Sequence, residues 1–137
     1  MFKKLITILF IIFPLTSAGE LAKYQEDEDR VIYFLTDSLE YTSNGSVVLW
    51  TLVDFKRSDK EFLSITTLFE FTCSPPKQYK ILRMEFFNNN MAEGGKLHTE
   101  DASDPNSNLH NKSWAYPAAS SNTYQMISDV CDVLSSM

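Results

Sequence analysis

Histidine and carboxylate side chains that could act together occur at one place in the sequence. His98, Glu100 and Asp101 lie within four consecutive residues, and on a strand His98 and Glu100 would share a face. Imidazole and carboxylate groups are zinc ligands, so these residues form a candidate site for a weakly metal-dependent protein. The His-x-Glu spacing also occurs in zinc deaminases, but their Pro-Cys-x-x-Cys motif is absent. The more common interpretation is a set of polar residues at the exposed end of a strand.

No other pattern points to catalysis. His110 lies in a polar stretch with no nucleophile at a recognisable spacing, and the serine-hydrolase, phosphate-loop and zinc-protease motifs are absent. We therefore expect a protein that is not an enzyme and that has no cofactor.

The N-terminal residues predict export. Two lysines precede the apolar run Leu5–Leu15, and Thr16–Ala18 supplies the small residues that a signal peptidase reads. The run is too short to cross a bilayer, which takes roughly 20 residues. We predict a signal peptide over residues 1–18, cleaved between Ala18 and Gly19, and no membrane span afterwards. No cysteine follows Ala18, so the lipid-attachment pattern is missing, and a periplasmic, secreted or cell-surface location is expected.

The charge balance restricts the partners. When Lys3 and Lys4 leave with the signal peptide, 12 basic side chains become ten against 18 acidic ones, a net charge of −8. Such a surface repels nucleic acid and favours a basic partner, so we expect a protein partner. Residues 19–30 contain the carboxylates Glu26–Asp29 and are expected to form a polar, solvated segment ahead of one domain over residues 31–137.

Two apolar runs predict the centre of a β-sheet. Val47–Phe55 is apolar on both alternating faces, as in a strand covered on both sides, whereas Phe62–Cys73 alternates like a half-buried strand. Further strands are expected at Val31–Leu35, at Lys96–Glu100 and, as an edge strand with charges on both faces, at Gln78–Phe87. One helix covers only one face of a sheet, so the doubly apolar run also suggests a dimeric structural subunit as an alternative.

The C-terminal residues predict a helix that packs on this sheet. The stripe along it consists of Tyr124, Ile127, Cys131 and Leu134. Asn122 is the expected N-cap, with Gln125 at the third helical position.

The two cysteines, Cys73 and Cys131, predict how helix and sheet are joined. An exported chain with two cysteines more often holds a structural disulfide than a redox site, although two separately buried thiols are the alternative. Cys73 ends the apolar face of a strand and Cys131 lies on the helical stripe, so a bond would staple one to the other. The predicted fold is α+β: a single antiparallel β-sheet of about five to six strands, a C-terminal α-helix packed across it, and one intramolecular disulfide.

Trp114 and Tyr116, just ahead of this helix, form a candidate interaction patch. Tryptophan and tyrosine are favoured at the energetic centres of interfaces. The alternative is that Trp114 packs at the sheet edge where the chain enters the helix.

Three stretches together resemble the surface-adhesin protein E-like family of Gram-negative bacteria. Val48–Phe55 is similar to its V-x-W-x-L-x-D-aromatic strand, Phe69–Cys73 to its next strand, and Trp114-x-x-Pro117, Ser121 and Val130-Cys131 to its closing signature. The resemblance implies a small antiparallel sheet, a C-terminal helix, an intramolecular disulfide and a binding role without catalysis. We therefore expect an exported interaction module of the cell envelope, adhesin-like, whose partner is a host or envelope protein. A homodimer or a metal-dependent protein are the alternatives.

Overall fold

The computed structural model describes residues 20–57 and 61–137. The predicted signal peptide and its cleavage position between Ala18 and Gly19 lie outside the described residues. In chain order the elements are β1 (Leu21–Glu26), β2 (Arg30–Leu35), the 3-10 helix η1 (Thr36–Ser38), β3 (Glu40–Tyr41), β4 (Val47–Phe55), β5 (Ser64–Phe71), β6 (Tyr79–Phe87), the 3-10 helix η2 (Asn90–Ala92), β7 (Lys96–Asp101) and α1 (Asn122–Ser135).

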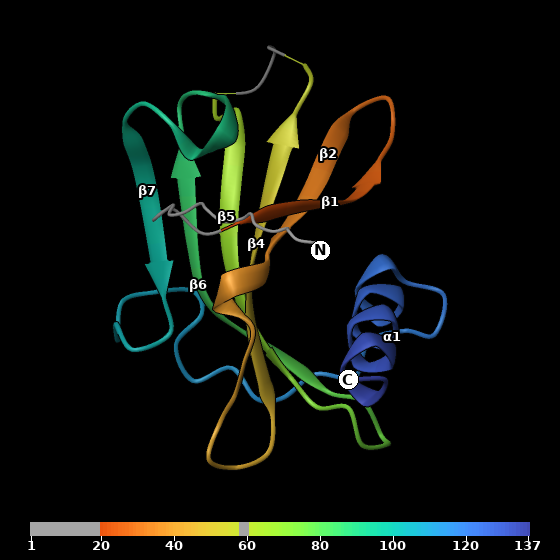
Figure 1. Ribbon diagram of the computed structural model, residues 1–137. Helices are drawn as coiled ribbons and strands as arrows, with labels where there is room; N and C mark the ends of the chain where they lie inside the picture. Colours follow the sequence, from red (N-terminus) through yellow and green to blue (C-terminus); the bar gives the residue numbers. More distant parts are fainter. Residues whose placement is uncertain (1–19, 58–60) are drawn as a thin grey trace, which may run out of the picture.

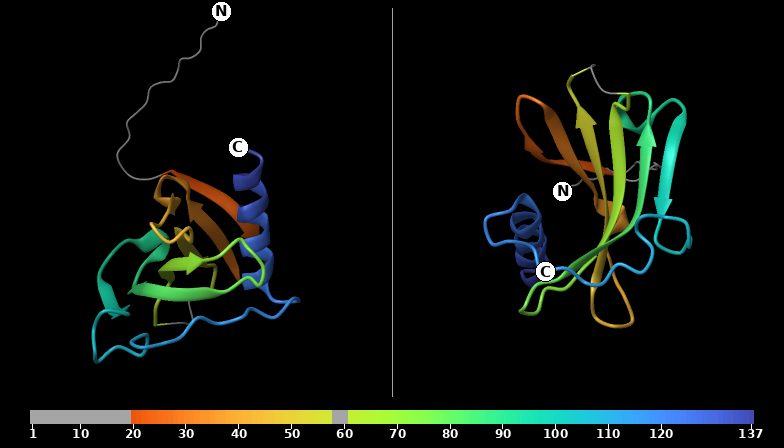
Figure 2. Two further views of the ribbon diagram at one scale, coloured as in Figure 1. Left: turned by 90° about the horizontal axis from the view of Figure 1, so that it is seen from below. Right: turned by 180° about the vertical axis from the view of Figure 1, so that it is seen from behind.

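All strands belong to one antiparallel sheet. Its order is β1-β2-β4-β5-β6-β7, and β3 pairs with the first half of β4 where β2 has ended. The sheet is strongly twisted, so that β1 runs across β4 and β5 in the view of Figure 1. Seen from below, α1 stands between the β1–β2 hairpin and the joined ends of β5 and β6 (Figure 2). The predicted single sheet with one C-terminal helix is confirmed.

The sheet begins earlier in the chain than the sequence indicated. Leu21–Glu26, assigned to a polar segment ahead of the domain, forms β1 and pairs with β2. The acidic residues that follow make the exposed hairpin turn, where Asp27 Oδ1 accepts hydrogen bonds from the backbone N–H groups of Asp29 (2.8 Å) and Arg30 (3.0 Å). Lys23 and Lys56 pair with Glu26 and offset its charge. An acidic turn is therefore compatible with a strand on each side of it.

The predicted edge strand Gln78–Phe87 is also corrected. It forms β6, which lies between β5 and β7, so β7 is the edge strand on that side of the sheet. Its charged residues are half-buried rather than solvated because they pair with each other and with the neighbouring strand. Arg83 contacts both Glu85 and Asp101, and Lys96 Nζ lies 3.0 Å from Glu85. A strand inside a sheet can thus carry charge on one face when that face is an ion-pair network.

The core lies where β4 begins, β5 ends and α1 crosses them. Val47, Leu49, Phe71, Met126, Ile127 and Val130 form one buried cluster. Ile127 is fully buried and marks the centre of the helix face. The predicted packing face of the helix is therefore nearly correct. Its centre is shifted, because Met126 and Val130 are buried whereas Tyr124 and Leu134 are half-buried.

The start of α1 and its covalent link complete this core. The N-cap is Ser121 and not Asn122, because the Ser121 hydroxyl accepts a hydrogen bond from the backbone N–H of Tyr124 at 3.1 Å. Cys73, two residues beyond β5, is bonded to Cys131 in α1, with their Cα atoms 5.6 Å apart. The predicted disulfide is confirmed, and it joins the helix to the end of the sheet.

Candidate functional site

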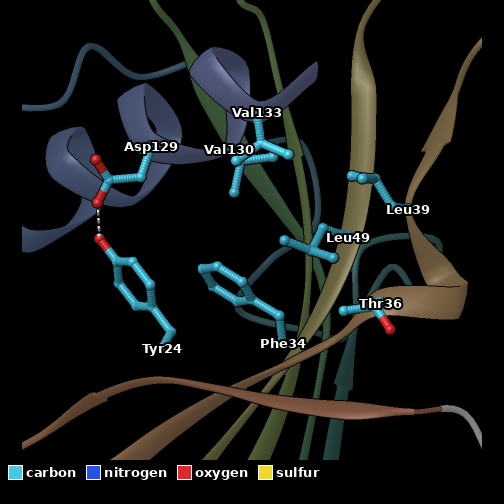
Figure 3. A pocket seen from close by; sticks show the side chains of 8 residues that line it. All are labelled: Tyr24, Phe34, Thr36, Leu39, Leu49, Asp129, Val130 and Val133. Carbon is cyan, nitrogen blue, oxygen red and sulfur yellow. Dashed lines mark hydrogen bonds between the residues drawn. The ribbon is translucent and has the colours of Figure 1, made fainter. Parts of the chain in front are cut away.

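An apolar groove runs along the side of α1 that faces β1, β2 and β3. Its main cavity, of about 280 Å³, is lined by Tyr24, Phe34, Thr36, Leu39, Leu49, Asp129, Val130 and Val133 (Figure 3). A second cavity, of about 200 Å³, adjoins it at Leu39 and is lined by Leu39, Glu40, Tyr41, Val47, Leu134 and Met137. We call the two cavities together the β3–α1 groove.

A break in the strand pairing places Tyr24 at one end of the main cavity. The register between β1 and β2 shifts at Tyr24, which is the extra residue of a β-bulge, and such bulges redirect a side chain. The Tyr24 hydroxyl donates to Asp129 Oδ2 at 2.5 Å (Figure 3), and its ring stacks on Phe34 with the ring centres 4.5 Å apart. Tyr24 therefore bridges β1 to α1 and closes this end of the groove.

The surroundings of Tyr24 keep its hydroxyl group protonated. Burial, followed by the hydrogen bond to Asp129, raises the pKa of the Tyr24 hydroxyl well above its ordinary value of 10.0. The hydroxyl therefore remains protonated and able to donate at physiological pH. Gln125 Nε2 also donates to Asp129, at 2.9 Å, so the one acidic group of the main cavity has both oxygens engaged.

The open side of the groove is apolar and acidic. Tyr41 is 65% exposed, Val133 is 59% exposed and Met137 is 90% exposed. Two charged residues, Glu40 and Asp129, line the two cavities. No lysine, arginine or histidine lines either cavity in the described part of the chain. Exposed apolar side chains rimmed by polar residues are typical of an interaction site.

The residues proposed for metal binding do not come together. His98 and Glu100 share a face of β7 and contact each other, as the strand period predicts. Asp101 lies on the opposite face, paired with Arg83. Within residues 20–57 and 61–137, no group of three or more histidine, cysteine or acidic residues is placed to hold a metal ion. The structure thus places Asp101 away from His98 and Glu100, although the metal hypothesis needs all three in one place.

Glu100 serves instead to hold the loop that follows β7. It accepts hydrogen bonds from the Ser107 hydroxyl at 2.5 Å and from the Asn108 backbone N–H at 2.9 Å. These bonds, with the contact to His98, lower the pKa of Glu100 from 4.5 to about 2. The second histidine, His110, lies within the same loop and its Nδ1 is 3.0 Å from the Ala102 carbonyl oxygen.

Trp114 and Tyr116 lie on either side of a short pairing with β6. Ala115 and Tyr79 exchange two backbone hydrogen bonds of 2.9 Å, which hold this segment at the start of β6. Trp114 is half-buried, with Lys80 Nζ 5.2 Å from its ring centre, whereas Tyr116 is exposed. Their role as an interaction patch stays a prediction.

The second apolar face of β4, which suggested a dimer, is partly covered by the chain itself. The loop between β6 and β7 folds over the ends of β4 and β5, where the Met91 N–H donates to Asp54 Oδ1 at 2.7 Å and the Ala92 N–H to Ser64 Oγ at 2.8 Å. On the face of β4 away from α1, Leu52 is only 2% exposed. The apolar pattern of β4 therefore does not require a second subunit.

Comparison with known proteins identifies the family. The model of the surface-adhesin protein E family matches residues 20–132, which is most of the chain. The chain belongs to the surface-adhesin protein E family. This agrees with the resemblance seen in the sequence, and the match begins at β1, so it includes the strand that the sequence left outside the domain. No curated protein and no solved structure matches the chain.

Membership of a surface-adhesin family suggests a protein partner and an exported or cell-surface location. Within the described part of the chain, no helix is long and apolar enough to cross a membrane. The disulfide agrees with an oxidising compartment outside the cytoplasm.

Sequence reasoning missed the groove. Its signal was present in the helix, where Val130 and Val133 lie beside the predicted stripe and make the apolar arc of α1 wider than one packing face needs. Tyr24 gave no such signal, because its position depends on a bulge and on a contact with Asp129, more than a hundred residues later.

Proposed function

We propose that this member of the surface-adhesin protein E family is an exported, non-catalytic interaction module of the cell envelope that binds a protein partner in an adhesin-like role. The observation that carries the proposal is the family match over residues 20–132. The proposal includes a periplasmic or released form as well as a surface form.

The character of the groove supports binding rather than catalysis. Its walls are mostly aliphatic and aromatic side chains, which stabilise a bound apolar group, with Thr36 and Asp129 as the polar exceptions. The carboxylate of Asp129 is held by two hydrogen bonds, from Tyr24 and Gln125, which suits a structural role at the rim.

Two measurements test the proposal. Protease treatment of intact and of permeabilised source cells, followed by antibody detection, locates the protein on the surface or in the periplasm. Labelled exported protein is then titrated on host-cell surfaces and on isolated envelopes, with the unfolded, reduced protein as the control. We expect saturable binding that unlabelled folded protein competes away. Absence of saturable binding to both preparations would contradict the proposal.

A further inference from the structure

The β3–α1 groove has the chemistry of a docking site for a peptide segment. We infer that it binds an extended segment of the protein partner in which a bulky apolar side chain is flanked by lysine or arginine. This inference rests on the proposed function and names the site and the kind of segment recognised.

The apolar part of the inference follows from the packing beside α1. On one side of the helix, Met126 and Ile127 fill the core, and Val130 lies between the core and the main cavity. On the side of β1 and β3 the structure instead leaves cavities of about 280 and 200 Å³, with Val133 and Tyr41 exposed at their openings. Covering these side chains with an apolar group would remove them from water without displacing any part of the core.

The size of the main cavity favours a side chain over a small-molecule ligand. Sites for small molecules enclose roughly 300–1,000 Å³ and present several polar groups that orient the ligand. The main cavity is at the lower end, at about 280 Å³, and its acidic group already has hydrogen-bond partners. A cavity of about 150 Å³ holds benzene, so this one accommodates a leucine, phenylalanine or tryptophan side chain.

The charge of the rim decides which segment fits. Glu40 and Asp129 line the groove, and no lysine, arginine or histidine of the described residues lines its two cavities. The sequence of α1 contains no lysine, arginine or histidine. Lysine or arginine beside the apolar anchor would meet opposite charge here, which favours association and orients the segment.

The same charges argue against other occupants. A second copy of this chain, with a formal net charge of −6 for the full sequence, would present acidic groups to acidic groups. Anionic lipid surfaces attract basic segments, so an acidic rim repels them.

Synthetic peptides test the inference on the exported protein. The probes are fluorescein-labelled Lys-Ser-Lys-Trp-Lys-Ser-Lys, the same peptide with alanine for tryptophan, and the same peptide with glutamate for every lysine. Binding is followed by fluorescence anisotropy. We expect saturable binding of the first peptide, at least about tenfold weaker binding of the alanine peptide, and no binding of the glutamate peptide.

Variants place the peptide in the groove. Val133→Lys adds bulk and positive charge at an exposed position of the opening, so it should fold and weaken binding at least tenfold. Glu40→Gln should weaken binding several-fold and reduce its dependence on salt. The matched control for Glu40→Gln is Glu93→Gln, an exposed acid in the loop after η2 that should leave binding unchanged. Tyr116→Ala tests the other candidate patch.

The outcomes separate this inference from the proposed function. Equal binding by Val133→Lys and the unmodified protein, equal binding of the tryptophan and alanine peptides, or loss of binding with Tyr116→Ala alone would each overturn the groove assignment. So would stronger binding to anionic vesicles than to the basic peptide. If labelled protein still binds host cells or envelopes while the groove variant binds them equally well, the groove is wrong and the proposed function stands.

Discussion

Removing the Cys73–Cys131 disulfide should destabilise the whole domain and loosen α1 first. The bond joins positions 58 residues apart, and closing a loop of that length lowers the entropy of the unfolded chain by an amount worth about 4 kcal/mol at 25 °C. A domain of this size has a total stability on the order of 5–15 kcal/mol, so the loss is a large share of it. We expect the double variant Cys73→Ala/Cys131→Ala to lose about 2–5 kcal/mol in urea denaturation.

The structure also predicts which element loses the most local stability. α1 packs on the sheet through Met126, Ile127 and Val130, while the side facing β1 and β3 borders the groove. Without the disulfide, amide hydrogens of α1 should exchange faster relative to those of β4 and β5 than they do in the oxidised protein. Reduced but unsubstituted protein is the control and should behave like the double variant. A double variant as stable as the oxidised protein, or equal acceleration of exchange in α1 and β4, would refute the reasoning.

Three further perturbations follow from single side chains. Ile127→Ala removes a fully buried side chain and should cost about 2–5 kcal/mol in urea denaturation, whereas Val133→Ala, at an exposed position, should cost far less; similar losses would contradict the assigned helix face. Ser121→Ala removes the N-cap bond and should lower stability by about 0.5–2 kcal/mol, while Asn122→Ala should be nearly neutral; the reverse order would restore Asn122 as the cap. Glu100, whose pKa is lowered from 4.5 to about 2, stabilises the folded state above pH 4.5 and loses that contribution as the pH falls toward 2. Glu100→Gln should therefore be less stable than the unmodified protein at pH 7, and the difference between their urea midpoints should shrink between pH 4.5 and 2; a difference that does not change with pH would show that the carboxylate charge is not involved.

The strands and the helix were largely readable from local pattern. Val47–Phe55 was predicted with its exact bounds because β-branched and aromatic residues continue without interruption between two turns. The disulfide was predictable because Cys73 ends the apolar face of a strand and Cys131 lies on the apolar stripe of the helix. The N-cap was misplaced by one residue because serine and asparagine are adjacent and both are good caps.

The neighbours of each strand were less predictable. The charges of β6 suggested an edge, yet Arg83 and Glu85 pair with each other and with β7, a contact that exists only once the two strands lie side by side. β1 was overlooked because its alternation is weak and an acidic turn follows it.

The sequence by itself indicated β4, β6, the C-terminal helix and the covalent link, because each depends on residues close together in the chain or on the two cysteines, whereas export stays a prediction. The tertiary structure alone showed the groove and the residues that the candidate metal ligands contact instead of a metal ion. A cavity exists where elements from the two ends of the chain fail to fill the space between them, as β1 and α1 do on either side of the bond from Tyr24 to Asp129. Asp101 lies opposite His98 and Glu100 because β7 extends through Asp101 and successive strand residues alternate between faces; what the sheet adds is the partner strand β6, whose Arg83 pairs with Asp101. The cavity and the pairing of Asp101 with Arg83 depend on contacts between distant residues, which local pattern does not show.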